Sequence, residues 1–399
     1  MSTNQVKPEL AFQSVWAAAK ELEREMTQIQ QALHQWPELG FQEVKTAALI
    51  ATILSEAGLE VKQGIGGTGV VAECRGKHPG PVIALRADMD ALPIQEETGL
   101  PYRSHREGHM HACGHDIHTS ILLGAAKIVQ RHADRLAGTV RFLFQPAEEL
   151  NAGAAAMMEE GVLEGVSEIY ALHNLPGLSA GQVAVRHGSM MASVDRIEIT
   201  ITGRGGHGAI PDQCIDPIVA ASGIVSGLQT AVSREISPFE SAVVTIGSFH
   251  AGDANNVIPS TAELTGTVRT FSSGLQKQMP GKLERIITHI ASAHGCQAAL
   301  RYIPQTPVLA GSEECVDKVK QTAAALLGSD KLHEAAPTMA GEDFANYLQE
   351  VPGCLFWLGS GTIGDTNEVF GLHHPKYKAD QACLVPGAAM LASLVLPKT

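Results

Sequence analysis

The segment HMHACGHDIH, residues 109–118, contains four histidines, one cysteine and one aspartate in ten positions. Thiolate, imidazole and carboxylate groups together suit zinc or a similar divalent ion. Cys113 and His115 are separated by a single glycine, so both side chains can face the same site. A bound divalent ion also lowers the pKa of a cysteine enough for it to ligate as the thiolate. The segment therefore predicts a metal site.

Further candidate ligands and acid–base groups lie at or just after the ends of three segments with the pattern of buried strands. They are Asp88, Asp90, Glu148, Glu149 and His173. In open parallel sheets ligands bind beyond the carboxyl ends of the strands, so these groups and the histidine-rich segment can meet at one sheet edge. Of two adjacent glutamates, one can bind a metal while the other reaches a water molecule as general base.

Each of these residues taken alone has a simpler structural interpretation. An isolated cysteine is usually a small buried apolar residue, and a strand-end histidine or a Glu–Glu pair is usually structural or solvated. His105 and His109 are expected to be solvated in a polar loop, Asp116 to cap a helix, and His118 to lie in the first turn of that helix. Four clusters at one sheet edge are harder to explain in this way and favour the metal site.

The elements that must position these residues alternate between helix and strand over most of the chain. The first part predicts helices at 13–34, 42–57, 117–132 and 152–160, and strands at 69–74, 81–88, 139–145 and 168–174. The last part predicts a helix at 313–327, a strand near 354–359 and a helix at 379–396. Short continuous apolar strands between helices indicate a buried, mostly parallel sheet, so the predicted fold class is α/β.

The middle of the chain has a different pattern, because its first strand alternates between apolar and polar residues. The elements predicted there are a strand at 194–202, a helix at 215–234, strands at 242–249 and 261–271, a helix at 274–294 and a strand at 297–303. This β-α-β-β-α-β order is that of a ferredoxin-like α+β domain. We expect such a domain at 189–304, inserted into an α/β domain formed by 1–188 and 305–399.

Composition argues against several classes of function. The chain of 399 residues has 29 basic and 42 acidic residues, a net charge of −13 and no basic run, which argues against binding to nucleic acid. The apolar C-terminal segment is interrupted at Pro386 and Gly387 and is too short to span a membrane. The first ten residues hold no apolar stretch and the seven cysteines form no CxxC pair, so we expect a reducing, cytoplasmic location.

Eight short motifs occur in the order RADMDALP, HACGHDIH, FQPAEE, HNLP, GRGGHGAIP, NVIP, GEDF and LHHPKY. With this set the chain resembles the amidohydrolase branch of the zinc aminoacylase and carboxypeptidase family over nearly its whole length. That branch includes hippurate hydrolases, N-acyl-amino-acid amidohydrolases and plant auxin-conjugate hydrolases. The resemblance implies a metallohydrolase domain with an inserted lid or dimerisation domain, acting on a small-molecule N-acyl amino acid.

The resemblance also implies a site for two divalent ions per chain, which would be zinc, manganese, cobalt or nickel. The ligands that match by motif are Cys113, His115, Glu149, His173 and His373. Cys113 would bridge the two ions. Relatives usually have histidine, then serine or asparagine, then proline in the segment that reads LHHPKY here, which favours His373 as the ligand and leaves His374 as the competing candidate.

The catalytic residues implied by the same motifs are Glu148 as general base and Asp90 as a carboxylate that orients a ligand; Asp88 has no assigned role. In the inserted domain, the residues that match substrate-binding positions are His207, Asn256 and Arg269. His207 would also be catalytic, because it matches a histidine that polarises the substrate carbonyl and that some relatives supply from the partner subunit. We therefore expect a homodimer or homotetramer.

The residues and the resemblance together predict a metal-dependent amidohydrolase that cleaves an N-acyl amino acid into a carboxylic acid and a free amino acid. A dipeptidase or carboxypeptidase of the same family is the first alternative. A thiol enzyme with Cys113 as nucleophile and His115 as base is the second, although it leaves the Glu148–Glu149 pair without a function. A non-catalytic metal-bound binder is the third, although such a protein has no need of Glu148.

Overall fold

The computed structural model describes residues 8–361 and 369–397, so most of the first ten residues, in which the sequence shows no apolar stretch, lie outside the described residues. The chain forms two compact units. Unit 1 comprises residues 1–188, 310–336 and 343–399, and unit 2 comprises 189–309 and 337–342. Unit 2 therefore extends five residues beyond the predicted boundary at 304 and takes in a short later segment that the sequence pattern does not mark.

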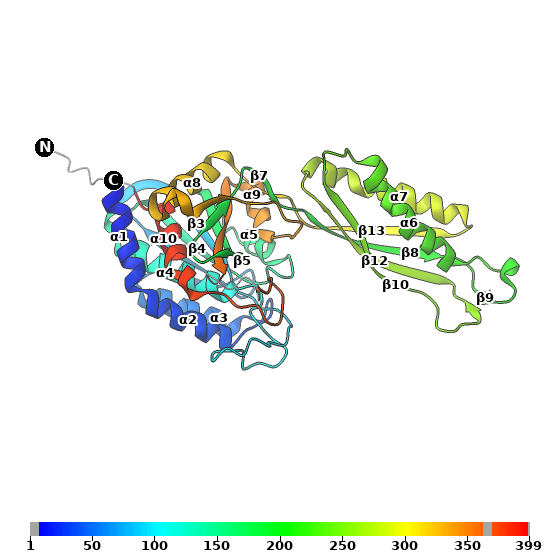
Figure 1. The fold of residues 1–399 in the computed structure, drawn as a ribbon, viewed down its shortest axis with the longest axis horizontal. Coiled ribbons are helices and arrows are strands. Elements are labelled where there is room, and N and C mark those ends of the chain that lie inside the picture. The colour runs from blue at the N-terminus through cyan, green and yellow to red at the C-terminus, as the bar shows by residue number, and fades with distance from the viewer. Residues whose placement is uncertain (1–7, 362–368, 398–399) are drawn as a thin grey trace. The chain divides into compact units, whose positions relative to one another are not determined.

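Unit 1 is built on an eight-stranded sheet with the order β1-β2-β4-β3-β5-β16-β6-β15. Its strands β3, β4 and β5 are labelled in Figure 1. Its strands are β1 (Glu60–Ile65), β2 (Gly69–Arg75), β3 (His78–Asp88), β4 (Ala137–Gln145), β5 (Val166–Ser179), β6 (Val183–Val185), β15 (Leu332–Glu334) and β16 (Gly353–Gly361). The central strands β4, β3, β5 and β16 are parallel to one another, and β15 is parallel to β6, whereas the β1–β2, β2–β4 and β6–β16 pairs are antiparallel. The predicted α/β class with a mostly parallel sheet is confirmed.

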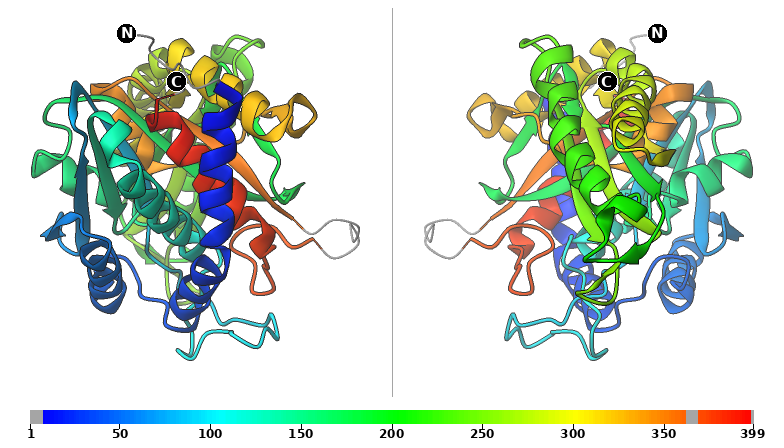
Figure 2. Two further views of the ribbon diagram at one scale, coloured as in Figure 1. Left: turned by 90° about the vertical axis from the view of Figure 1, so that its left-hand side faces the viewer. Right: turned by 90° about the vertical axis from the view of Figure 1, so that its right-hand side faces the viewer.

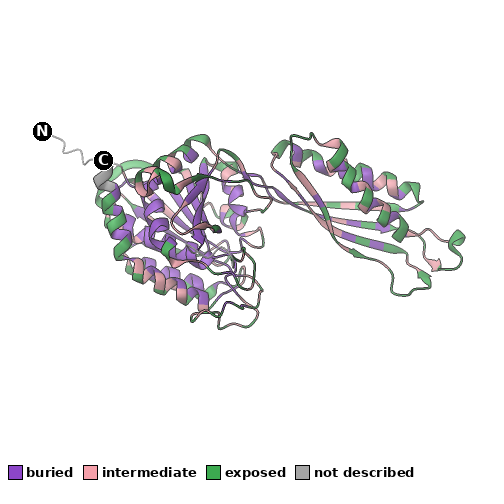
Figure 3. Cartoon of the chain, in the orientation of Figure 1, coloured by how far each residue is buried: buried purple, intermediate pink, exposed green. Residues whose placement is uncertain are grey.

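The helices of unit 1 are α1 (Pro8–Glu21), α2 (Glu23–Gln35), α3 (Val44–Glu56), α4 (His115–Arg131), α5 (Gly153–Glu159), α8 (Glu313–Leu327), α9 (Tyr347–Glu350) and α10 (Leu384–Val395). All residues of α10 are buried, and α4 and α10 share one apolar core with the sheet (Figure 3). The apolar C-terminal segment is therefore a core helix. In the described part of the chain no helix is long and apolar enough to cross a membrane.

Unit 2 contains a four-stranded antiparallel sheet with the order β10-β12-β8-β13. Its main elements are β8 (Val194–Thr202), α6 (Pro217–Glu235), β10 (Ala242–His250), β12 (Thr261–Thr270), α7 (Ser273–Ala293) and β13 (Gln297–Thr306). Helices α6 and α7 lie side by side on one face of this sheet (Figure 2). Alternation along β8 buries Ile197, Ile199 and Ile201 under the helices, as its sequence pattern predicts. This is the expected ferredoxin-like arrangement.

Several details differ from the sequence predictions. The helix expected at 13–34 is two helices with a turn at Leu22, a break that no glycine or proline marks. Helix α4 is preceded by Gly114 with φ 84°, so the predicted capping role of Asp116 is wrong. Short or charged strands were not predicted, namely β1, β6, β15, β7 (Gly188–Met191), β9 (Gly206–His207), β11 (Val257–Ile258) and β14 (Leu309–Gly311).

Candidate metal centre

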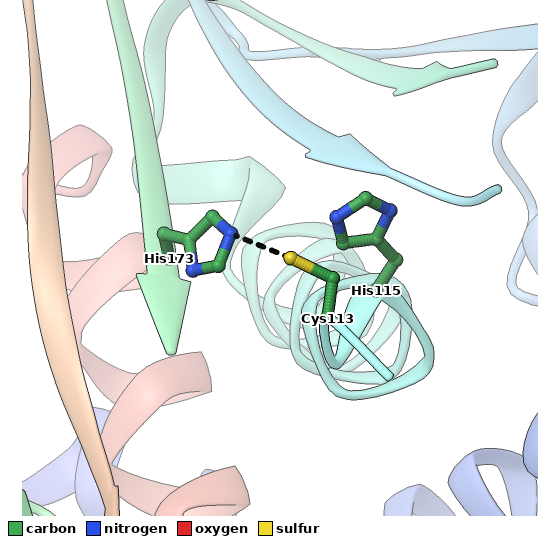
Figure 4. A group of neighbouring side chains, drawn as sticks. All are labelled: Cys113, His115 and His173. Carbon is green, nitrogen blue, oxygen red and sulfur yellow. Dashed lines mark hydrogen bonds between the residues drawn. The ribbon is translucent and has the colours of Figure 1, made fainter. Parts of the chain in front are cut away.

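The predicted loop and the end of β5 meet in unit 1. Cys113 lies just before α4, His115 begins that helix, and His173 lies on β5. The Cys113 Sγ is 3.5 Å from the Nε2 of His173, and ligand atoms of all three residues lie within 4.8 Å of one another (Figure 4). All three side chains are buried. One sulfur and two ring nitrogens therefore surround a common point at the carboxyl end of the parallel strands.

A second group shares its sulfur with the first. Ligand atoms of Cys113, Glu149 and His373 also lie within 4.8 Å of one another, and the Glu149 Oε1 is 3.2 Å from the Nε2 of His373. The same Glu149 oxygen is 3.9 Å from the Nε2 of His115. Two overlapping sets of donors with a shared thiol are the arrangement that two neighbouring ions with a bridging sulfur would need.

Hydrogen bonds to one nitrogen of each ring orient His173 and His115 so that the other nitrogen faces the cluster. The Nδ1 of His173 donates to the backbone oxygen of Asn174 at 2.9 Å, which leaves the lone pair of Nε2 facing Cys113. The Nδ1 of His115 donates to the Oδ1 of Asp90 at 3.1 Å, and its buried Nε2 makes no hydrogen bond to any described residue. Outer carboxylates and carbonyls commonly fix metal-binding histidines in this way.

The electrostatics of the cluster favour a positive charge inside it. Burial alone would lower the pKa of His115, but Asp88, Asp90 and Glu149 outweigh it and raise that pKa to about 10. Burial and the neighbouring carboxylates, Glu149 foremost, raise the pKa of the Cys113 thiol well above its usual range. A cluster that disfavours an extra anion and stabilises a cation is the environment that divalent ions would complete, so the residues present fit the metals that the sequence implies.

Asp88, the last residue of β3, and Asp90 both lie near the His115 ring, at 3.8 Å and 3.1 Å, but differ in their hydrogen-bond partners. Asp90 accepts from the ring of His115 with one oxygen and from the backbone N–H of Glu149, at 3.1 Å, with the other. Asp88 is fully buried and accepts from the Nδ1 of His118 at 2.6 Å and from the Nη1 of Arg86 at 2.7 Å. Asp90 thus orients two candidate ligands, whereas Asp88 belongs to a buried ion network beside them.

Glu148 lies next to the candidate ligands. Its carboxylate oxygen lies within 4.8 Å of ligand atoms of both His115 and Glu149, and the side chain is buried. The backbone N–H of Asp343, at the start of the turn before α9, donates to the Glu148 Oε1 at 3.4 Å. A buried carboxylate at this distance can exchange a proton with a group held between the ligand sets.

The geometry separates His373 from its neighbour. His373 adopts a left-handed conformation with φ 65°, its N–H donates to the oxygen of Ala112 at 2.9 Å, and its ring reaches Glu149. His374 instead stacks on Phe370 with ring centroids 4.4 Å apart. His105 packs edge-on against Trp36 and His109 bonds its own loop, so neither joins the cluster.

Three predicted substrate-binding residues lie in unit 2, two of them side by side. Asn256 lies next to Val257, which pairs with His207 across strands β11 and β9, and both His207 and Asn256 are exposed. The N–H of Ala209 donates to the Nδ1 of His207 at 3.1 Å, so the ring proton is on Nε2 and can be donated outward. Arg269 lies near the far end of β12, where it donates to Thr267 and to the Met339 backbone.

Residues beyond the predicted set also shape the centre. Arg86 lies inside β3, is 1% exposed, and donates to Asp88, Gln145 and Asp343. An arginine within a buried strand is a visible signal for such a network, because a buried charge requires partners. Asn174, whose backbone oxygen accepts from His173, also bonds the distant residues Cys113 and Tyr377, and its residue type gives no signal of these contacts.

Comparison with known proteins places the chain in a family. Residues 84–396 match the model of peptidase family M20/M25/M40. The chain belongs to this family. As a member of peptidase family M20/M25/M40 it is a hydrolase, and the resemblance stated from the motifs is confirmed.

Relatives within the family match over almost their full length. An N-acetylcysteine deacetylase of Bacillus subtilis is 44% identical over 95% of this chain and 98% of its own. An IAA-amino acid hydrolase of Arabidopsis thaliana (ILR1-like 2) is 40% identical over 93% of this chain and 84% of its own. A solved dinuclear metal-binding peptidase of family M20 from Bacillus subtilis is 40% identical, has a TM-score of 0.83, and covers 94% of this chain and 98% of its own.

Proposed function

We propose that this protein is a two-metal amidohydrolase that hydrolyses the amide bond of N-acyl amino acids. The observation that carries the proposal is the pair of donor groups that share the Cys113 sulfur, with buried Glu148 beside them. The two relatives reported above are named for action on N-acetylcysteine and on IAA-amino acids, and both names describe an acylated amino acid. That agreement supports the substrate class.

The proposed ligands are the five residues with converging donor atoms, Cys113, His115, Glu149, His173 and His373. Bound divalent ions would supply Lewis acidity and lower the pKa of a water molecule. This donor set accommodates zinc, manganese, cobalt or nickel, and raw affinity does not identify the one used in a cell. Asp90 would hold the His115 ring and the Glu149 backbone in place.

The chain's own residues would perform the proton transfers. Glu148 would accept a proton from the water whose oxygen attacks the amide carbonyl carbon. It would then give that proton to the leaving nitrogen as the C–N bond breaks, which releases a carboxylic acid and an amino acid. His207, with its proton on Nε2, would donate a hydrogen bond to the carbonyl oxygen as negative charge develops there. Asn256 would bind the substrate beside it.

The positions of His207 and Arg269 support a homo-oligomer. Within β12, Thr261, which lies next to the β9–β11 pair, and Arg269 are roughly 27 Å apart at the usual strand rise. The carbonyl and the carboxylate of one N-acyl amino acid are far closer together than that. If both residues touch one substrate, they come from different copies, so we propose at least a homodimer whose contacts include unit 2.

The thiol-enzyme alternative is weakened by the surroundings of Cys113. Burial and the adjacent carboxylates of Glu149 and Glu148 raise the pKa of its thiol, which is the opposite of what a cysteine nucleophile needs. All seven cysteines are free, and this supports the proposal of a reducing, cytoplasmic location.

The proposal is tested by measuring amino-acid release from acetyl, benzoyl, long-chain and indole-acetyl amino acids, with dipeptides as the competing class. We expect release that a chelator abolishes and that added manganese or zinc restores. Release from dipeptides alone would replace the proposal with a peptidase of the same family. Chelator-resistant release that an alkylating agent abolishes would favour the thiol enzyme instead.

A further inference from the structure

Asn174 lies where three segments that carry the proposed ligands meet. It follows His173 on β5 and is fully buried. Its main chain and side chain together hydrogen-bond to the loop before α4, to α4 itself, to β16 and to the segment after His373. These hydrogen bonds connect the side chain and main chain of one buried residue to four separate parts of unit 1.

Towards the loop and helix, Asn174 fixes the surroundings of two proposed ligands. Its Nδ2 donates to the backbone oxygen of Cys113 at 2.5 Å, and its own backbone oxygen accepts from the Nδ1 of His173 at 2.9 Å. Its backbone N–H donates to the Nε2 of His118 at 2.9 Å, and the other nitrogen of that ring bonds Asp88. The amide side chain of Asn174 therefore holds the backbone at Cys113, while the main chain of the same residue holds the His173 ring.

Towards the C-terminal segment, the amide oxygen of Asn174 accepts two hydrogen bonds from hydroxyls, one from Tyr377 at 2.6 Å and one from Ser360 at 3.0 Å. These two donors set the orientation of the amide, with its oxygen towards the hydroxyls and its NH₂ group towards Cys113. Tyr377 is buried with Met110 and Ala112 in a small apolar cluster. The N–H of His373 also donates to Ala112, so this segment is tied to the loop at two points.

We infer that Asn174 is a positioning residue, which holds Cys113, His173 and the His373 segment at the mutual spacing that two neighbouring ions require. The inference rests on the proposed function, because it assumes that these residues are ligands. Its physical basis is that a ligand held by buried, satisfied hydrogen bonds needs no reordering when an ion binds. Loss of the junction would weaken metal binding without removing any ligand atom.

The test measures manganese affinity of the chelator-treated full chain by calorimetry, for Asn174→Ala and Tyr377→Phe. We expect the dissociation constant to rise by roughly 10- to 100-fold in Asn174→Ala, in the range typical of outer-shell changes, and less in Tyr377→Phe. The matched control is Tyr170→Phe. Tyr170 lies on β5, and this change removes a tyrosine hydroxyl that bonds Glu168 at 2.7 Å. We expect this control to keep wild-type affinity.

A second measurement separates positioning from general destabilisation. The kcat of each variant is followed against manganese concentration on the best N-acyl substrate, at a temperature where its circular dichroism is wild-type. We expect saturating metal to restore most of kcat. Wild-type manganese affinity in folded Tyr377→Phe and Asn174→Ala would overturn the inference and leave the proposed function intact. A wild-type chain that binds no divalent ion and hydrolyses nothing would overturn the proposed function first.

Discussion

At the scale of single residues, the two ring nitrogens of His115 have different surroundings. Its Nδ1 is bonded to Asp90, while its buried Nε2 faces the cluster without a hydrogen-bond partner among the described residues. Asp90 in turn holds the N–H of Glu149, the neighbour of the proposed base. Asp90 therefore sets which nitrogen of His115 faces the cluster and also holds the backbone beside the proposed base.

Glu148→Gln tests the proposed base. The amide cannot accept a proton, so we expect kcat to fall by roughly 100- to 10,000-fold. Metal content should stay at the wild-type value, because Glu148 is not one of the proposed ligands. Turnover assays and elemental analysis check both parts, with Glu313→Gln at the exposed start of α8 as the control. Wild-type turnover in Glu148→Gln would exclude this residue as the base.

At the scale of elements, the entry into α4 depends on a left-handed backbone. Gly114 has φ 84°, a conformation that side chains with a Cβ rarely adopt. A Cβ at this position would lie 2.3 Å from the Asn174 Nδ2 and 2.7 Å from the Tyr377 hydroxyl. The turn that separates Cys113 from His115 can thus be made only by glycine at this packing density.

Gly114→Ala is expected to weaken manganese binding strongly, because the added methyl group displaces the Asn174 junction. Gly108→Ala is the matched control, since Gly108 has φ 68° and a Cβ added there would meet no atom within 4 Å. In both variants the free energy of unfolding should fall by about 1–2 kcal/mol, because alanine is strained in the left-handed conformation. Calorimetric titration distinguishes them, and equal metal affinity in the two variants would contradict a packing role for Gly114.

Helices α2 and α4 are joined by a buried ion pair. The His34 Nδ1 lies 2.8 Å from the Asp116 Oδ2, and its Nε2 lies 3.3 Å from the Glu96 Oε1. Burial alone would lower the pKa of His34, but these carboxylates, Asp116 foremost, outweigh it and raise the pKa to about 10. Asp116, predicted as a helix cap, instead anchors α2 next to the metal-binding loop.

The pair makes stability depend on pH. Since the pKa of His34 is raised on folding, its contribution is complete below about pH 6.5, the unfolded value, and is lost as the pH rises through about 10. Removing one partner of a buried pair typically costs roughly 3–5 kcal/mol. We expect the unfolding temperature of His34→Asn to lie well below that of the wild type at pH 7. The difference between the two unfolding temperatures should become smaller by pH 10.

Thermal unfolding of the chelator-treated protein measures this gap. His78→Asn, a change at an exposed histidine of unit 1, is the control and should track the wild type at every pH. A difference between His34→Asn and wild type that stays constant from pH 7 to pH 10 would show that the charge of His34 is not the stabilising feature.

At the scale of the whole molecule, unit 2 carries His207 and Asn256 at one end of its sheet and Arg269 near the other. If the proposed oligomer is correct, a complete site combines Glu148 of one chain with the partner's His207. A chain without a working Glu148 can then still supply His207 to its partner, and a chain without His207 can still supply Glu148. This arrangement predicts that two inactive variants restore activity in a mixture.

Glu148→Gln and His207→Ala, each inactive alone, are unfolded and refolded together in equal amounts. Half of the resulting dimers should be mixed, and each mixed dimer has one site with both residues intact, so about a quarter of wild-type activity should return. Refolding each variant alone is the control. No recovery, with mixed dimers confirmed by a mass tag, would place His207 in the same chain as the Glu148 that it assists.

Much of this protein could be predicted from its sequence. Alternation along 194–202 and the apolar runs of the parallel strands distinguished the two kinds of sheet, because periodicity depends on which face is buried. The order of motifs identified the family. The residue types of Cys113, His115 and Glu149 indicated metal chemistry, because few other reasons place such groups at strand ends.

Tertiary structure decided what sequence spacing cannot express. The different surroundings of His373 and His374, which support the proposed choice of His373 as ligand, depend on a left-handed residue and on a stack with Phe370. The partners of Asn174 lie 61 residues before it and up to 203 residues after it, so no local pattern signals them. Long-range hydrogen bonds are satisfied only once the chain has folded, and for this reason the positioning residues appear only in the structure.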